Sequence, residues 1–332
     1  MVESGVLRGK LLKAAAWIIT VGLLAYLFWR TPFSQVWASA RGAAPWTLPA
    51  GIALFACIYA ADSFAMWKTF GWFLAKFSYG QILLVRGATY LLAAINYNVG
   101  QGAIVYFVSR ARGVPILRGV ATVLLIMGIN VLALLFLASG GLLVAPDAPH
   151  SLVVILGAAY AGLAVYVGVV IAKPAWLARR PIFDVLLSAG LGGHLKALLV
   201  RVPHIAALVA FQTTMMHAFG VAVPVTQAIA CLPVVFFIAV LPISVQGLGT
   251  SQAMALFFFS RYATGDRAAQ EAAVLAASLA AQVIATVCQV LVGLACLRSR
   301  AGRELRSASH IAASEEVAAK AAASFDGGAP GR

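Results

Sequence analysis

Charged residues are scarce in this chain. Only 10% of its 332 residues are Asp, Glu, Lys or Arg, whereas a soluble globular domain carries about a quarter. Hydrophobic residues make up 62% instead, and the mean hydropathy is +0.95. The composition excludes a water-solvated two-domain protein and predicts an integral, polytopic membrane protein.

Acidic residues are the scarcest charged type, 10 against 24 Lys and Arg, which leaves a net charge of +14. The basic residues are scattered between apolar stretches and form no continuous patch, so no nucleic acid is expected as a partner. The four cysteines include no CxxC pair, which argues against a zinc site or a disulfide framework. A nucleotide-binding loop is also missing, and we expect no cofactor and no metal.

Six apolar stretches are long enough to cross a bilayer, for which about 20 residues are needed. They are residues 14–29, 47–67, 119–145, 151–172, 202–221 and 272–297. Two further apolar stretches, 82–109 and 227–260, are interrupted by glycines, amides and, in the second, a proline. Such breaks are tolerated at membrane depth only against protein or a water-filled cavity.

The positions of the basic residues orient these segments. If both interrupted stretches crossed the membrane, each side would carry 12 Lys and Arg; if both turn back, one side carries 20 and the other 4. The positive-inside rule therefore predicts two re-entrant hairpins and places both termini in the cytoplasm. We expect an all-α polytopic membrane protein of six full transmembrane helices plus two re-entrant hairpins.

This order of segments is an inverted repeat. Each half, about 10–145 and 151–297, holds two spans, a hairpin and a further span, with every direction reversed in the second half. Gly100 and Gly247 lie at corresponding points, 147 residues apart. Inverted repeats with interrupted helices indicate a transporter whose binding site lies near the bilayer midplane.

The two breaks also carry a family resemblance. The residues are Asn98-Val99-Gly100-Gln101-Gly102 followed by Ser109-Arg110-Ala111-Arg112-Gly113-Val114-Pro115, and Leu241-Pro242-Ile243-Ser244 with Gly247-Leu248-Gly249-Thr250-Ser251-Gln252. Here the chain resembles the flippase-like family named after the transmembrane region of lysylphosphatidylglycerol synthase, and its length is similar to the branch found with hopanoid biosynthesis. The resemblance implies an inner-membrane protein that moves a lipid or lipid-linked headgroup between leaflets.

The chain departs from that family at two acidic positions. Members often carry a glutamate shortly after each break, where this chain has Ile104 or its neighbours and Gln252. A mechanism that uses those carboxylates is therefore not expected. Residues 1–300 are expected to form one membrane domain, followed by a mobile cytoplasmic tail, 301–332. The aminoacyl-transferase domain of the full-length synthases has no room, so we expect no lysine transfer and no enzyme activity.

The candidate site residues gather at the two breaks and beside them. For substrate binding we select the acid inside a span, the arginines around the first break, and the amides, glycines and serine of both breaks. They are Asp62, Arg86, Asn96, Asn98, Gly100, Gln101, Gly102, Arg110, Arg112, Ser244, Gln246, Gly247, Gly249 and Gln252. The guanidinium groups of arginines bind lipid phosphate, and side-chain amides bind hydroxylated or phosphorylated groups. No catalytic residue is assigned.

Several of these residues have a purely structural alternative. Asp62, the acid inside a predicted span, needs a partner because a mid-membrane carboxylate costs roughly 2.5–3.5 kcal/mol. Arg86 and Lys68 are its candidate partners. The resulting ion pair would either be purely structural or take part in headgroup binding or proton relay. The break amides could simply cap loose backbone. Residues 179–201 are predicted to form a helix lying in the cytoplasmic interface.

The predicted function is translocation of a lipid or lipid-linked headgroup between leaflets of the inner membrane. Two alternatives stay open: an intramembrane lipid-modifying enzyme that uses Asp62 and His217, and a non-catalytic scaffold for lipid biosynthesis. The expected partners are the bilayer and a membrane lipid, which is a phospholipid, a polyprenyl-linked lipid or a hopanoid. Homo-oligomers and complexes with lipid biosynthesis enzymes also stay open.

Overall fold

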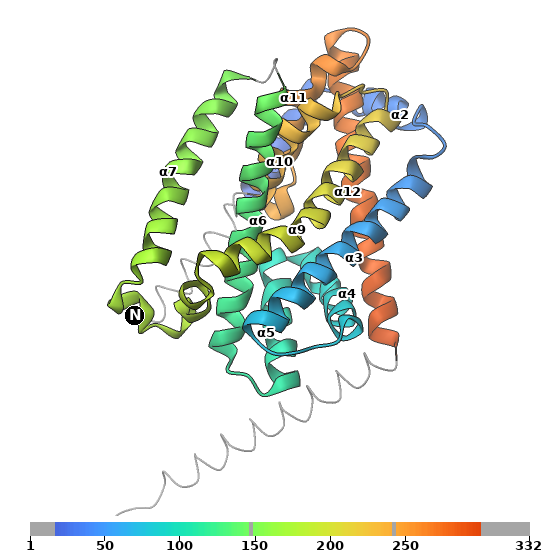
Figure 1. Ribbon diagram of the computed structural model, residues 1–332. Coiled ribbons are helices and arrows are strands. Elements are labelled where there is room, and N and C mark those ends of the chain that lie inside the picture. The colour runs from blue at the N-terminus through green and yellow to red at the C-terminus, as the bar shows by residue number, and fades with distance from the viewer. Residues whose placement is uncertain (1–16, 146–148, 241–243, 300–332) are drawn as a thin grey trace, which may run out of the picture.

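The computed structural model describes residues 17–145, 149–240 and 244–299, and this part of the chain is all-helical apart from one isolated bridge (Figure 1). The elements are an apolar helix Trp17–Arg30, α2 (Phe33–Arg41), α3 (Thr47–Phe73), α4 (Tyr79–Ile95), α5 (Tyr97–Arg112), α6 (Ile116–Val144), α7 (His150–Ala172), α8 (Ala175–Ala178), η1 (Pro181–Phe183), α9 (Asp184–Ala218), α10 (Val225–Val240), η2 (Val245–Gly247), α11 (Thr250–Phe259), η3 (Ser260–Tyr262) and α12 (Arg267–Arg298). The long helices pack as a bundle.

Five helices of the described chain are long and apolar enough to cross a membrane. They are α3, α6, α7, α12 and the helical segment Pro181–Ala218, which contains α9. These helices overlap five of the six expected spans. The remaining span, expected at 14–29, begins outside the described residues, and its described part belongs to the shorter apolar helix Trp17–Arg30. The architecture is that of a helical, membrane-embedded protein.

Helices α4 and α5 fold back on each other around a single residue. Asn96 is extended, with φ −156°, and its side chain accepts hydrogen bonds from the amides of Asn98 and Val99 at the start of α5. This N-cap satisfies donors that a helix start leaves free. At the other end Arg112 Nη2 donates to Gln81 Oε1 over 3.2 Å, which joins the last turn of α5 to the first turn of α4. The first interrupted stretch is thus a pair of antiparallel helices.

Helices α10 and α11 fold back in the same way. The segment before α10 meets the segment after α11 through an antiparallel bridge between Val221 and Ala263. Between the two helices, Gly247 and Gly249 have φ of 74° and 83°, a region that is open to glycine and strained for other residues. Residues 241–243, part of the predicted break, lie outside the described residues.

Each folded-back pair contains a glycine packed tightly against an alanine of the preceding helix. A Cβ on Gly100 would lie 2.6 Å from Cβ of Ala93, and a Cβ on Gly247 would lie 2.7 Å from Cβ of Ala239. Both distances are too short for real carbon atoms. The two positions that correspond in the predicted inverted repeat therefore have the same local packing, in which only glycine fits without a shift.

Gly100→Ala should lower the free energy of unfolding by about 1–3 kcal/mol, because the added methyl group would overlap Ala93. Gly102→Ala is the matched control, since this glycine lies on the same helix with nothing within 4 Å of the built Cβ. Alanine there should be neutral or slightly stabilising. Thermal unfolding in detergent measures both variants. Equal midpoints would contradict the close approach of α4 and α5.

Residues 179–201, for which an interfacial helix is predicted, include η1 and the first half of α9. Helix α9 has a kink at Gly190, where φ is 57°, and beyond it continues into the span expected at 202–221. One face of this segment packs in the core. Ala197 is 2% exposed and belongs to a cluster with Leu125 of α6. Its other apolar side chains, such as Leu195 at 57%, are exposed as on an ordinary span.

Candidate functional site

Asp62 lies at the middle of α3 and is 1% exposed. It belongs to a stripe of buried residues that repeats every three or four positions, the spacing of one helix face. The stripe runs through Gly51, Phe55, Ile58, Asp62, Ala65 and Thr69. This register turns the carboxylate toward neighbouring helices and away from lipid. A carboxylate in such a place has to be paired.

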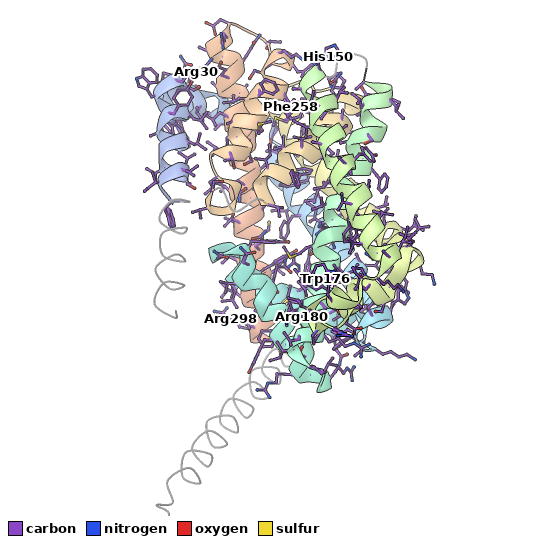
Figure 2. All side chains as sticks on the ribbon, turned by 90° about the vertical axis from the view of Figure 1, so that its left-hand side faces the viewer. Arg30, His150, Trp176, Arg180, Phe258 and Arg298 are labelled. Atoms are coloured by element: carbon purple, nitrogen blue, oxygen red, sulfur yellow. The ribbon has the colours of Figure 1, made fainter. Side chains whose placement is uncertain are left out.

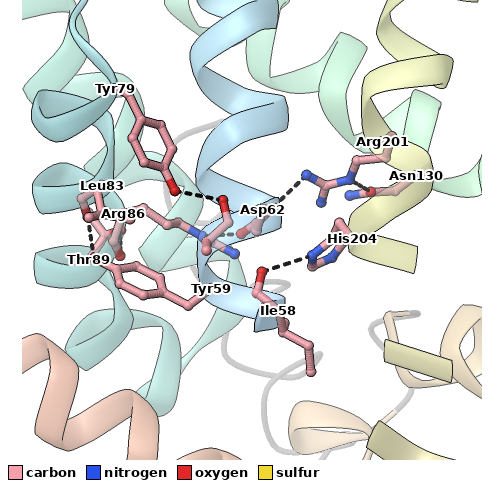
Figure 3. A network of polar contacts seen from close by, with 11 residues as sticks. Ile58, Tyr59, Asp62, Tyr79, Leu83, Arg86, Thr89, Asn130, Arg201 and His204 are labelled. Atoms are coloured by element: carbon pink, nitrogen blue, oxygen red, sulfur yellow. Dashed lines mark hydrogen bonds and ion pairs between the residues drawn. The ribbon is translucent and has the colours of Figure 1, made fainter. Parts of the chain in front are cut away.

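Two arginines from two other helices engage this carboxylate (Figure 3). Arg86 of α4 places Nε 2.5 Å from Oδ2, and Arg201 of α9 places Nη1 2.5 Å from Oδ1. The side chains of Asp62, Arg86 and Arg201 are 2%, 11% and 5% exposed. These three residues, which we call the ion cluster, therefore join α3, α4 and α9 through buried charges.

Further side chains support the arginines of the ion cluster. Asn130 of α6 accepts a hydrogen bond from Nε of Arg201 through its amide oxygen. The guanidinium of Arg86 lies 4.7 Å from the ring centre of Tyr90, a cation–π contact. His204, one turn beyond Arg201, has Nδ1 3.4 Å from a backbone carbonyl oxygen of α3. Four helices thus contribute groups to one polar centre.

Two tyrosines fix the spacing of α3 and α4 beside the ion cluster (Figure 3). The hydroxyl of Tyr59 donates to the carbonyl of Leu83 over 2.5 Å, and that of Tyr79 donates to the carbonyl of Ala60 over 3.0 Å. Each bond runs from one helix to the backbone of the other. The geometry of the ion cluster is therefore preorganised by its surroundings.

The ion cluster contains one more positive than negative charge, because two guanidinium groups share one carboxylate. Nη1 of Arg86 is buried and has no hydrogen-bond partner among the described residues. An unpaired charged donor is costly in a low-dielectric interior. This arrangement can bind a further anion or a strong hydrogen-bond acceptor at Arg86.

Only some of the predicted charged residues come together. Asp62 meets Arg86, whereas Lys68 lies outside the ion cluster, with Nζ 4.2 Å from the centre of a tryptophan ring. Arg110 and Arg112 are exposed at the end of α5, where each lies over an aromatic ring, at 5.9 and 4.9 Å. They are therefore positioned at the helix end and not at the buried carboxylate.

The polar residues of the first break mainly shape the backbone. Asn96 caps α5 through its side chain, which is the structural role left open above. Asn98 is exposed and Gln101 is half-buried. Gly100 is buried against α4, whereas Gly102 is exposed. The side chain of Asn98 is thus exposed, while that of Asn96 is already used by the fold.

The second break is also held by its own side chains. Gln252 is 1% exposed, and its Oε1 accepts a hydrogen bond from the amide of Gly249 over 2.7 Å. The hydroxyls of Ser244 and Thr250 lie 2.8 Å apart. The side chain of Gln246 lies outside the described part of the structure. Gln252 and Ser244 therefore serve the turn between α10 and α11.

Arg201 is the member of the ion cluster that the sequence does not single out, because it lies just before the span expected at 202–221, where a loop cation is expected. A signal was present: His194, Ala197, Arg201 and Ile205 follow one another at intervals of three or four residues and are all buried. Asn130, the partner of Arg201, is a polar residue inside the span expected at 119–145, where an interhelical hydrogen bond is the common role of an amide side chain.

The second residue of the enzyme alternative, His217, lies near the end of α9. Its Nε2 is 2.8 Å from the carbonyl oxygen of Val223, whereas both carboxylate oxygens of Asp62 contact arginines. In the part of the chain that the structure describes, no group of three or more His, Cys, Asp or Glu is placed to hold a metal ion.

No model of a known protein family matches this sequence, and no curated protein matches it significantly. The resemblance at the two breaks therefore stays a prediction.

Proposed function

We propose that this chain is a flippase-like permease that moves a lipid or lipid-linked headgroup between the leaflets of the bacterial inner membrane. The observation that carries the proposal is the surplus positive charge of the ion cluster. A lipid phosphate supplies the missing negative charge and the acceptor for Nη1 of Arg86. Guanidinium groups bind phosphate through charge-assisted hydrogen bonds. The cargo is therefore a lipid with an anionic headgroup.

The folded-back helix pairs form the path in this proposal. The pair α4–α5 and the pair α10–α11 enter the membrane from opposite faces as re-entrant hairpins, and six full helices surround them. Interrupted helices at corresponding points of an inverted repeat line the binding sites of many transporters. Arg86 of the ion cluster lies on α4, one helix of the first hairpin. In this proposal a headgroup reaches the ion cluster along that hairpin.

The basic end of the molecule faces the cytoplasm in this proposal. Figure 2 shows Trp176, Arg180 and Arg298 toward one end of the bundle, with Arg30 and His150 toward the other. Tryptophan and arginine at that end suit an interface with anionic lipid. Leaving the buried Arg86 and Arg201 out of the loop count does not change which side carries the excess. Both chain termini then lie in the cytoplasm.

Reconstitution into liposomes tests the proposal. Fluorescent phosphatidylglycerol, phosphatidylcholine and a polyprenyl phosphate are each followed by quenching from outside, with and without a proton gradient or membrane potential. Anionic lipid should change leaflets at least about tenfold faster than in protein-free liposomes, which corresponds to a barrier lower by about 1.4 kcal/mol. Lipid movement at the protein-free rate for the whole panel would overturn the proposal and favour the scaffold alternative.

A further inference from the structure

A large apolar cavity lies between α6, α7 and α10, with a volume of about 680 Å³. Small residues on two of its walls create the space; they are Gly128 and Ala138 of α6 and Ala158, Ala159 and Gly162 of α7. Among the described residues that line the cavity, only Tyr166 carries a polar group, and its hydroxyl is 2.6 Å from Nε2 of His194. The side chains of the cavity therefore offer almost nothing that could hold water.

The outer wall of the cavity is α7, the helix at the edge of the bundle in Figure 1. Only 11% of the most apolar part of this helix is buried inside the protein, the lowest share among the five span candidates of the described chain. Tyr160 bonds Ser139 of α6 over 2.9 Å, and Tyr166 bonds His194 of α9. Tyrosine side chains thus bridge α7 to α6 and to α9, while a space between α6 and α7 stays unfilled by side chains.

The cavity opens onto the apolar outer surface. Val131, Ile155 and Phe237 line it and are 40%, 39% and 36% exposed. They come from α6, α7 and α10, respectively. The opening is thus continuous with the surface that a bilayer would cover. The hydrocarbon chains of lipids are therefore its immediate neighbours.

The length of the cavity fits one leaflet. Its lining on α6 runs from Gly128 to Ala138, which at the helical rise corresponds to about 15 Å. The hydrocarbon core of a bilayer is about 30 Å thick. A chain that enters the cavity along the membrane normal therefore spans about half of the core, as one acyl chain does.

We infer that this cavity holds one fatty acyl chain of a bilayer phospholipid. An empty cavity of this size loses dispersion contacts along its whole lining. Water is not a substitute, because it needs several polar partners. An acyl chain restores the contacts without burying a polar group. This inference rests on the helices lying in a bilayer and not on lipid translocation.

Photolabelling in lipid nanodiscs tests the inference. The probe is phosphatidylglycerol with a diazirine on one acyl chain, and labelled peptides are mapped by mass spectrometry. Gly128→Leu and Gly162→Leu fill the cavity, and neither glycine has any atom within 4 Å of a built Cβ. Gly140→Leu on α6 and Gly168→Leu on α7 are matched controls, equally open but outside the lining.

In the wild-type protein we expect labels concentrated on the cavity-lining peptides of α6, α7 and α10. Each filling variant should reduce this labelling at least about fivefold, the equivalent of losing the burial of one or two methylene groups. The controls should leave it unchanged. Labels spread evenly over the lipid-facing helices, or unchanged in both filling variants, would overturn the inference. Crosslinks between two copies through α7 would also overturn it, since a second protein would then cover the cavity.

The same experiment separates this inference from the proposed function. If no lipid moves in the liposomes while the cavity is still labelled selectively, the acyl-chain inference is supported and the permease proposal is refuted. If lipid moves but the cavity is labelled no more than the rest of the surface, the permease proposal is supported and the acyl-chain inference is refuted.

Discussion

Asp62→Ala should destabilise the protein by about 3–5 kcal/mol, the cost of breaking a buried ion pair from one side. Its carboxylate contacts two guanidinium groups at 2.5 Å each, and all three side chains are nearly or fully buried. Alanine would leave two buried positive charges with no counter-ion. Thermal unfolding in detergent, followed by the fluorescence of the seven tryptophans, measures the loss.

Glu271 provides a matched control for this variant. Its Oε1 also lies between two arginines, 2.8 Å from Arg30 and 3.0 Å from Arg267. Those arginine side chains are 39% and 80% exposed, so water and salt screen the pairs. Glu271→Ala should therefore shift the unfolding midpoint only slightly. Equal shifts for the two variants would contradict the burial of the ion cluster and would indicate that water reaches Asp62.

Local chemistry predicts the two folded-back helix pairs well. Asn96 begins α5 as its N-cap, and Gly113 ends α5 in a left-handed turn with φ 62°; both are visible as residue types. Gly247 and Gly249 mark the turn before α11 by the same reasoning. These signals act within a few residues, so a sequence displays them directly. They do not say which other helices the pairs contact.

The ion cluster could be predicted only in part because its contacts differ in sequence separation. Asp62 and Arg86 are 24 residues apart on consecutive apolar segments, so their pairing follows from adjacency. Arg201 is 139 residues from Asp62, and its pairing depends on how α3 packs against α9. A count of loop charges treats every arginine between apolar stretches alike. Only the buried spacing around Arg201 separates it from a surface cation such as Arg180.

The cavity beside α7 could not be predicted from sequence either. Gly128 and Gly162 look like the small residues that let membrane helices approach closely. In the structure they face open space, and the side chains of Tyr160 and Tyr166 bridge α7 to its neighbours. Whether a small residue closes or opens a space depends on the position of the whole helix, which is a tertiary property.

Arg86→Met should remove lipid movement while leaving the fold intact, because the charges that remain balance. Without Arg86, the carboxylate of Asp62 still pairs with Arg201, and the pair is neutral. The loss of stability should be about 1–3 kcal/mol, from the hydrogen bond that Oδ2 of Asp62 loses and from the contact with Tyr90. The free donor Nη1 disappears with the side chain. Transfer of anionic lipid should fall roughly 10- to 100-fold, since a hydrogen bond to a charged group contributes about 1.5–3 kcal/mol.

The control for this variant is Arg118→Met, which removes an exposed arginine at the start of α6. It should leave both the transfer rate and the unfolding midpoint near those of the wild type. A second comparison uses phosphatidylcholine, whose zwitterionic headgroup depends less on the surplus charge. Arg86→Met should therefore slow the transfer of phosphatidylcholine less than the transfer of phosphatidylglycerol. If Arg86→Met moves phosphatidylglycerol at the wild-type rate, the ion cluster is a structural clamp. Its surplus charge then has no part in recognising a headgroup, and the path for lipid must lie elsewhere in the molecule.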